Sequence, residues 1–147
     1  MSDAAVAQAA DASTTPGRAV HWHSARVSQR VPIAAQVWLF ELSPEAAYPF
    51  ERVSPGAHID VELPNGVVRQ YSLLTHLGEQ PPRLVIAVKR DGLGRGGSMQ
   101  LCDEAEPGTR LRIGVPRNHF ALHAGEAPAV LFAGGIGITP ILSLIHI

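Results

Sequence analysis

The sequence predicts a mainly β domain of barrel type, followed by the beginning of an α/β unit. Two observations support this prediction. Between residues 23 and 115, short runs of β-type residues alternate with turn residues, and long helical patterns are absent. After residue 125, a continuous apolar run, a glycine-rich turn and a second apolar run follow one another. Several antiparallel strands without long helices favour a closed or nearly closed barrel.

Six barrel strands are expected from the pattern of apolar and turn residues. They span residues 25–30, 36–42, 58–63, 67–74, 84–89 and 110–115. Pro64, Asn65 and Gly66 join the third and fourth strands in a tight hairpin, because Asn-Gly supplies the positive φ angles of such a turn. One helix is expected before the last strand, at residues 97–105, and Pro107 follows its end.

The last part of the chain has the pattern of a strand, a turn and a helix. Residues 130–133 form a continuous apolar run, which is typical of a buried parallel strand. Pro140 is expected at the first position of the helix that follows. The alternative is a membrane-spanning helix over residues 127–145, which needs about 20 apolar residues. Several glycines and Pro140 fall inside that span, so we expect no membrane segment.

The chain is therefore expected to have three parts. Residues 1–20 are alanine-rich and lack the basic and apolar regions of a signal peptide, which predicts a disordered tail. Residues 21–122 hold the barrel, and residues 123–147 hold the start of a second domain. One strand–helix unit has no sheet to pack against, so we expect this domain to be truncated. The final LSLIHI resembles a translated transposon end, which suggests a sequence that is not native.

Composition excludes several functions. The chain has 147 residues, of which 46% are hydrophobic and 17% charged, as in a packed domain. Its net charge is −1 without a basic block, so no nucleic-acid partner is expected. Cys102 is the one cysteine, which excludes internal disulfides and cysteine-based metal centres and favours a cytoplasmic setting. The histidine pairs at residues 21/23 and 119/123 have no clustered carboxylate, so no metal site is expected.

Polar residues interrupt the strand expected at residues 67–74. Arg69 and Tyr71 are two apart and therefore project from one face. The tyrosine can offer a flat face to an aromatic ring, and the guanidinium can bind a phosphate. Ser72 can contact a ring edge through its amide or hydroxyl. The alternative is a half-exposed structural strand with a solvated Arg69.

Two glycine-rich stretches are further candidates for a ligand site. GLGRGGS, residues 92–98, leads into the expected helix, and its Ser98 can cap that helix or bind a phosphate. AGGIGITP, residues 133–140, lacks the G-x-G-x-x-G spacing of dinucleotide folds, but Thr139 can present a hydroxyl to a ring. The alternatives are a flexible loop and a close strand–helix crossing.

The order of the motifs R-x-Y-S, IAVKR, GRGGS, P-R-N-x-F and AGGIGITP resembles the ferredoxin–NADP reductase superfamily. The closest likeness is to its phthalate dioxygenase reductase and vanillate demethylase reductase branch, over residues 25–142. The resemblance implies a six-stranded antiparallel Greek-key barrel that binds flavin. It also implies an α/β nicotinamide-binding domain and a two-iron two-sulfur domain, most of which this chain lacks.

The resemblance also implies the residues of the site. Tyr71 and Thr139 are expected nearest the chemistry. The expected cofactor-binding residues are Arg69, Tyr71, Ser72, Ala87, Val88, Lys89, Gly96, Gly97, Ser98, Gly134, Gly135, Gly137 and Thr139.

The implied function is electron transfer from NADH or NADPH to flavin and then to a two-iron two-sulfur cluster. The partner would be the oxygenase component of an aromatic-ring dioxygenase or demethylase system. The GRGGS form implies FMN in preference to FAD. We expect this fragment to retain mainly the flavin-binding part. The alternative is a non-catalytic β-barrel binding module without flavin.

Overall fold

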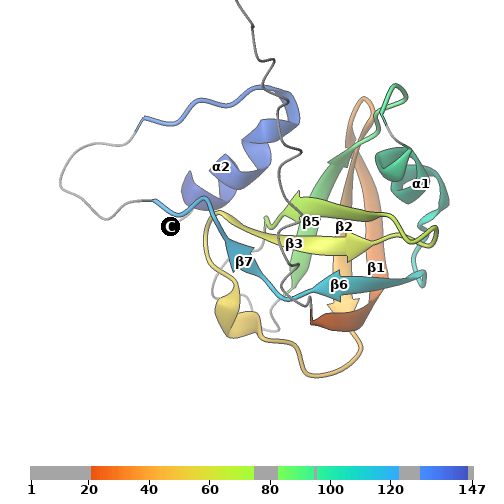
Figure 1. Ribbon diagram of the computed structural model, residues 1–147. Coiled ribbons are helices and arrows are strands. Elements are labelled where there is room, and N and C mark those ends of the chain that lie inside the picture. Colours follow the sequence, from red (N-terminus) through yellow and green to blue (C-terminus); the bar gives the residue numbers. More distant parts are fainter. Residues whose placement is uncertain (1–20, 75–82, 95, 123–129, 146–147) are drawn as a thin grey trace, which may run out of the picture.

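The computed structural model describes residues 21–74, 83–94, 96–122 and 130–145, and the tail predicted at residues 1–20 lies outside them. Antiparallel strands form one sheet that curls around a core (Figure 1). In chain order they are β1 (Trp22–Ala34), β2 (Val37–Pro44), β3 (Ala57–Glu62), β4 (Val68–Ser72), β5 (Leu84–Lys89), β6 (Arg110–Gly114) and β7 (Arg117–Asn118).

The strand order is β4-β3-β6-β1-β2-β5, and β7 pairs with β3. The mainly β prediction is confirmed, and each of the six expected strands is present with small shifts at its ends. Strand β7 was not predicted. The sheet is not fully closed: no ladder between its end strands β4 and β5 is found in the described part of the chain, where the bridge between Leu73 and Ile86 and the bond from the Leu74 amide to the Val85 carbonyl (2.8 Å) bring their ends together.

Alternate residues of the strands point into the barrel and form its core. Ile59 and Val61 of β3, Ile113 of β6 and Phe40 of β2 are completely buried. Most of their neighbours in sequence are more exposed, as expected for a period of two residues, whereas Asp60, between Ile59 and Val61, is buried and paired with Arg117. Burial of each such side chain contributes about 1.5–3 kcal/mol to the free energy of folding, so the inward-facing apolar residues provide most of the stabilisation of the barrel.

The β3–β4 hairpin is joined by the three predicted residues, Pro64, Asn65 and Gly66, but the positive φ angle expected at Asn65 is not found. Gly66 has φ +79°, but Asn65 is not in the positive-φ region. The Gly66 amide donates to the Leu63 carbonyl (2.8 Å), and the Val67 amide donates to Asn65 Oδ1 (3.0 Å). The connection is thus a three-residue loop that ends in a left-handed glycine, and Pro64 provides the fixed φ that starts the turn.

Helix α1 (Gly97–Glu104) packs on the barrel with Leu101 and Cys102 buried. Of the two roles considered for Ser98, capping of this helix is not found. Gly96 occupies the cap position with φ 82°, and no side chain caps the helix. Ser98 instead accepts a hydrogen bond at its hydroxyl oxygen from the Asp91 amide (3.1 Å), which fixes the preceding loop.

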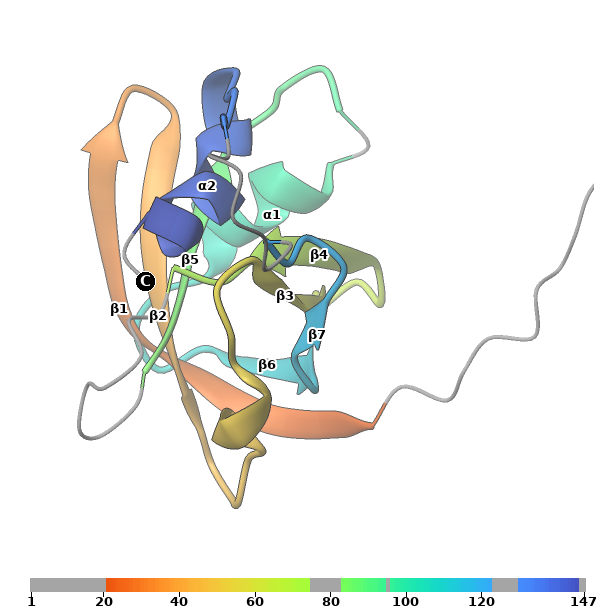
Figure 2. The same ribbon diagram turned by 90° about the vertical axis from the view of Figure 1, so that its left-hand side faces the viewer.

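A short helix η1 (Phe50–Arg52) precedes β3, and the chain ends with η2 (Gly135–Gly137) and α2 (Ile138–Ile145). Figure 1 shows α2 at one side of the barrel, and in Figure 2, turned by 90°, the helix lies in front of the strands. Pro140 is the third residue of α2, where its missing N–H still breaks no helical bond. None of the helices in the described ranges is both long and apolar enough to span a bilayer.

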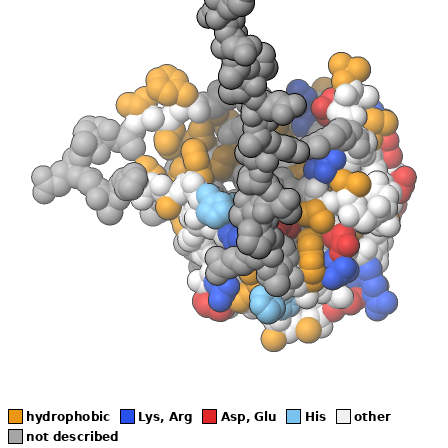
Figure 3. All heavy atoms as spheres, in the orientation of Figure 1, with side chains coloured by type: hydrophobic (Ala, Val, Ile, Leu, Met, Phe, Trp, Pro, Cys, Tyr) orange, Lys and Arg blue, Asp and Glu red, His pale blue; other side chains and the backbone are white. Residues whose placement is uncertain are grey.

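The strand predicted at residues 130–133 is not formed. Val130 is 73% exposed and Phe132 is 90% exposed, and neither belongs to a strand. A buried parallel strand needs neighbouring strands, and the described part of the chain offers none at this place. Figure 3 shows apolar side chains gathered on the surface over the segment that carries α2.

Candidate functional site

A cleft of about 340 Å³ lies where β4, β5 and the η2–α2 segment meet. Its volume is in the range of small-molecule sites. Three residues that the sequence did not single out, Gln70, Ile136 and Pro140, help to line it. The other lining residues were all predicted: Tyr71, Ser72, Ala87, Val88, Lys89, Gly137 and Thr139.

The cleft exists because β4 and β5 are the two ends of the sheet. Among the residues that the structure describes, each strand carries a ladder on one edge, β4 with β3 and β5 with β2. Beyond the Leu73–Ile86 bridge, the facing edges of Ser72 and Ala87 carry backbone groups outside any ladder among the described residues. Such edge groups are suited to hydrogen bonds with the rim of a flat polar ring.

Tyr71 and Arg69 lie on the core-facing side of β4, as the spacing predicts. They pair across the sheet with the buried Ile59 and Val61. The Tyr71 ring packs against the core. Burial, and to a smaller extent the charge of Cys102, raises the pKa of Tyr71 to about 12. Tyr71 therefore presents a neutral hydroxyl and a fixed aromatic face at physiological pH.

Arg69 lies over the start of α1 and outside the cleft lining. A Cβ atom on Gly97 would stand 2.9 Å from Arg69 Nε and 3.1 Å from its Cγ, so only glycine allows this approach. Arg69 Nη1 also donates to the Val68 carbonyl (2.9 Å). The guanidinium and the first amides of α1 together form a positive region that can receive a phosphate.

Thr139 is buried, and its hydroxyl donates to the Ile136 carbonyl (3.0 Å). The hydroxyl proton is thus used within the turn, and Oγ1 keeps lone pairs for a donor in the cleft. Gly134 and Gly135 are exposed and do not line the cleft. The structure therefore brings only part of the third glycine stretch to the site.

His58 lies directly across the sheet from Ser72, which lines the cleft. Burial, and then the charges of Arg117 and His119, lower the pKa of His58 below its usual value of 6.5, while Asp60 opposes the shift. The unfolded chain therefore binds this proton more readily than the folded chain does.

We expect the free energy of unfolding to fall as the pH drops from above 6.5 through the folded-state pKa of His58. A depressed histidine pKa contributes stability that is complete above the unfolded value and is lost on acidification. Urea unfolding of His58→Gln in EDTA should show a shallower pH dependence than the wild type. An equal slope in His58→Gln would contradict this assignment, and His21→Gln is the control.

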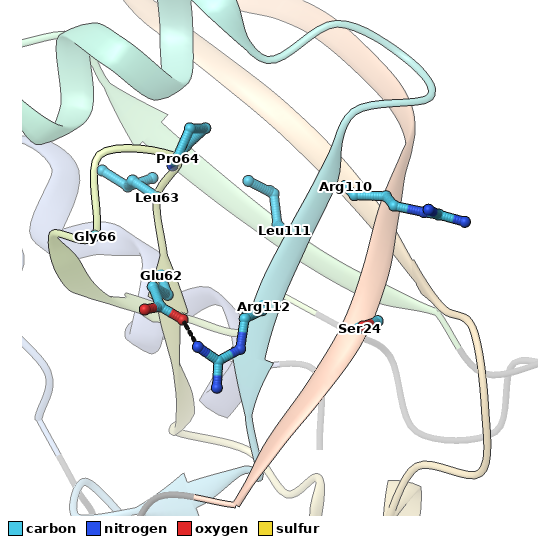
Figure 4. Close-up of a pocket in the computed structure, with 8 residues that line it drawn as sticks. All are labelled: Ser24, Glu62, Leu63, Pro64, Gly66, Arg110, Leu111 and Arg112. Atoms are coloured by element: carbon cyan, nitrogen blue, oxygen red, sulfur yellow. Dashed lines mark ion pairs between the residues drawn. The ribbon is translucent and has the colours of Figure 1, made fainter.

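Another cleft, of about 310 Å³, is lined by residues of β1, β3, β6 and the β3–β4 turn (Figure 4). Glu62 and Arg112 point toward each other there and form an ion pair of 2.5 Å. The Arg112 guanidinium also lies 5.1 Å from the centre of the Trp22 ring. None of the predicted site residues lines this cleft. Glu62 and Arg112 are paired with each other, and Arg110 is paired with Glu45 outside the lining, so the first cleft is the stronger candidate.

No family model matches the chain. It is 41% identical to phthalate dioxygenase reductase of Burkholderia cepacia over 119 residues, which are 81% of this chain and 37% of the relative. It is 55% identical to vanillate O-demethylase oxidoreductase of Pseudomonas putida over 93 residues, 63% of this chain and 29% of the relative. The chain thus spans about a third of the length of these relatives.

Solved structures of similar proteins match the fold of this chain. A solved structure of phthalate dioxygenase reductase matches with a TM-score of 0.78 at 39% identity, over 85% of this chain and 39% of that chain. An intact type IV self-sufficient cytochrome P450 monooxygenase matches with a TM-score of 0.75 at 36% identity, over 84% of this chain and 16% of that chain.

Proposed function

Because this chain belongs to the ferredoxin–NADP reductase superfamily, in its phthalate dioxygenase reductase-like branch, we propose that it is the flavin-binding part of an NAD(P)H-dependent reductase. In this proposal residues 21–122 form the flavin domain, and residues 123–147 begin the nicotinamide domain. The observation that carries the proposal is the cleft that gathers predicted residues from β4, β5 and the η2–α2 segment.

The residues of the cleft fit a flavin. Ala87 and Val88 are largely buried and form an apolar wall, while Tyr71 supplies an aromatic face beside them. Ser72, Lys89 and the strand edges supply polar groups for the rim of the ring. This combination of apolar walls and a few polar groups is typical of cofactor sites.

The phosphate of the cofactor is assigned to Arg69 and the start of α1. Gly97 permits the close approach of Arg69, and Gly96 opens the helix in a conformation that favours glycine. Ser98 lies at the second position of α1, so its amide is among those without a helical acceptor. We infer FMN in preference to FAD, because the GRGGS form of this loop resembles that of the FMN-binding branch.

A bound flavin would supply hydride acceptance and single-electron transfer, which no side chain provides. The residues of the chain position the ring and shield it from water. Tyr71 would pack on the ring with its hydroxyl neutral, Arg69 would compensate the phosphate charge, and Thr139 Oγ1 would be available to accept a hydrogen bond from the cofactor. No side chain has to act as a general acid or base in this scheme.

The complete protein would take electrons from NADH or NADPH and pass them through a two-iron two-sulfur cluster to an oxygenase component. Relatives named as reductases of phthalate dioxygenase systems support this proposal. A cytoplasmic location is part of the same proposal, since the soluble cofactors NADH and NADPH are available there.

The test is titration of the purified chain with FMN and FAD, followed by the visible spectrum and by quenching of flavin fluorescence. We expect saturable uptake of one FMN per chain and weaker binding of FAD. A colourless protein that takes up neither flavin would contradict the proposal. That outcome would favour a non-catalytic β-barrel module.

Tyr71→Ala should weaken FMN binding roughly three- to tenfold, because an aromatic contact contributes about 0.5–1.5 kcal/mol beyond area burial. Tyr71→Phe is the matched control and should stay near the wild type, since it keeps the ring and removes only the hydroxyl. Fluorescence titration gives both affinities, and circular dichroism checks that the variants fold. Equal affinity of Tyr71→Ala and the wild type would remove Tyr71 from the site.

A further inference from the structure

Two histidines from different segments lie against each other on the outer face of the barrel. His58 belongs to β3, and His119 directly follows β7. Their ring centres are 5.1 Å apart, and the ring planes are inclined by 56°. The β3–β7 pairing brings them together, because it places Ala57 opposite Asn118 and His58 opposite Arg117.

The nearest charges balance each other. Arg117 Nη2 donates to Asp60 Oδ2 at 2.6 Å, and the Asp60 side chain is almost completely buried. The cation beside the imidazoles is thus already paired with a carboxylate. Imidazole binds metals in its neutral form.

We propose that His58 and His119 form a two-histidine binding site for a divalent transition-metal ion such as Zn²⁺ or Ni²⁺. Imidazole nitrogens suit these ions. Two imidazoles that share one ion through bonds of about 2.0–2.1 Å have ring centres roughly 4.5–5.5 Å apart. The observed separation of 5.1 Å lies in that range.

Water completes the coordination in this site. Among the described residues, no group of three or more His, Cys, Asp or Glu side chains gathers around a common point. The site is therefore an open one of two protein ligands, unlike the closed four-ligand sites of structural zinc. Such a site is exchangeable, and its affinity depends directly on both imidazoles.

The ion would tie β3 to the segment that leaves the barrel after β7. Asn118 already holds that segment through bonds from its Nδ2 to Ser54 Oγ (2.8 Å) and to the Pro55 carbonyl (2.7 Å). An ion bound only by the folded arrangement adds to folding stability by mass action. The site requires no flavin, so its test is independent of the proposed redox function.

The test is isothermal titration of the full chain with NiCl₂ and separately with ZnCl₂ near neutral pH. We expect one saturable site with a contribution from each imidazole, so His58→Gln and His119→Gln should each weaken binding at least tenfold. His21→Gln, which removes another exposed histidine, is the matched control and should bind as the wild type does.

Thermal unfolding gives the second measurement. ZnCl₂ should raise the unfolding temperature of the wild type and of His21→Gln but not that of His119→Gln. His119 is exposed, so its replacement leaves the core intact. Absence of saturable binding to the wild type would overturn the proposal. Unchanged affinity in the His58→Gln/His119→Gln double variant would also overturn it, because the ion would then bind other histidines.

Discussion

Gly56→Ala is expected to lower the free energy of unfolding by about 2–4 kcal/mol. Gly56 has φ +84°, a conformation that L side chains rarely adopt. A Cβ atom there would also collide with the carbonyl group of Phe120, which cannot move away as a flexible side chain can. Backbone strain and the collision therefore add, and urea unfolding measures their sum.

Gly66→Ala is the matched control for this change. Gly66 has φ +79°, but no atom lies within 4 Å of the position that a Cβ would take. This variant keeps the strain and lacks the collision, so we expect a loss of about 1–2 kcal/mol. Equal losses in free energy of unfolding in the two variants would show that the collision with the Phe120 carbonyl does not contribute to the effect of Gly56→Ala.

Gly97→Ala should weaken FMN binding about ten- to thirtyfold, or about 1.4–2 kcal/mol, while the protein stays folded. The new Cβ would stand 2.9 Å from Arg69 Nε and 3.1 Å from its Cγ, which is too close, so the side chain would have to shift and the guanidinium would move from the start of α1. The flexible Arg69 side chain can move, and alanine favours a helix more than glycine does, so stability should change little. Fluorescence titration with FMN measures the affinity.

Gly92→Ala, in the same loop, is the control, because its Cβ would meet only Arg90 Nη1 at 3.9 Å. A double-mutant cycle with Arg69→Ala identifies the cause. If Gly97→Ala acts by displacing Arg69, the double variant should bind FMN no more weakly than Arg69→Ala alone. Additive losses would show that Gly97 affects the cofactor by another route.

Strand positions could be predicted because each depends on a local pattern. Residues 84–89 were predicted as a strand, and β5 has the same bounds. The run of apolar residues and the residues that flank it define where the strand begins and ends. The helix at Gly97–Glu104 was likewise located by its composition and its end. Its cap was not, because the left-handed Gly96 satisfies the loop geometry and leaves Ser98 to bond with Asp91.

The errors arose where the outcome depends on distant neighbours. The apolar run at residues 130–133 has the composition of a buried strand, but a strand also needs partners, and Phe132 is exposed here. Strand β7 is too short for any periodic signal, and its pairing with β3 determines its existence. The Asn-Gly turn was expected to use two positive φ angles, whereas Pro64 allows a three-residue loop with one.

By itself the sequence determined the class of the fold and most residues of the candidate site, because alternation and motif order are properties of neighbouring residues. Only the tertiary structure decided that the ends of β4 and β5 face each other across a cleft, that Arg69 covers Gly97, and that His58 meets His119. Each of these contacts joins segments far apart in the chain. Strand register and side-chain packing establish such contacts, and neither can be read from the pattern of neighbouring residues in the sequence.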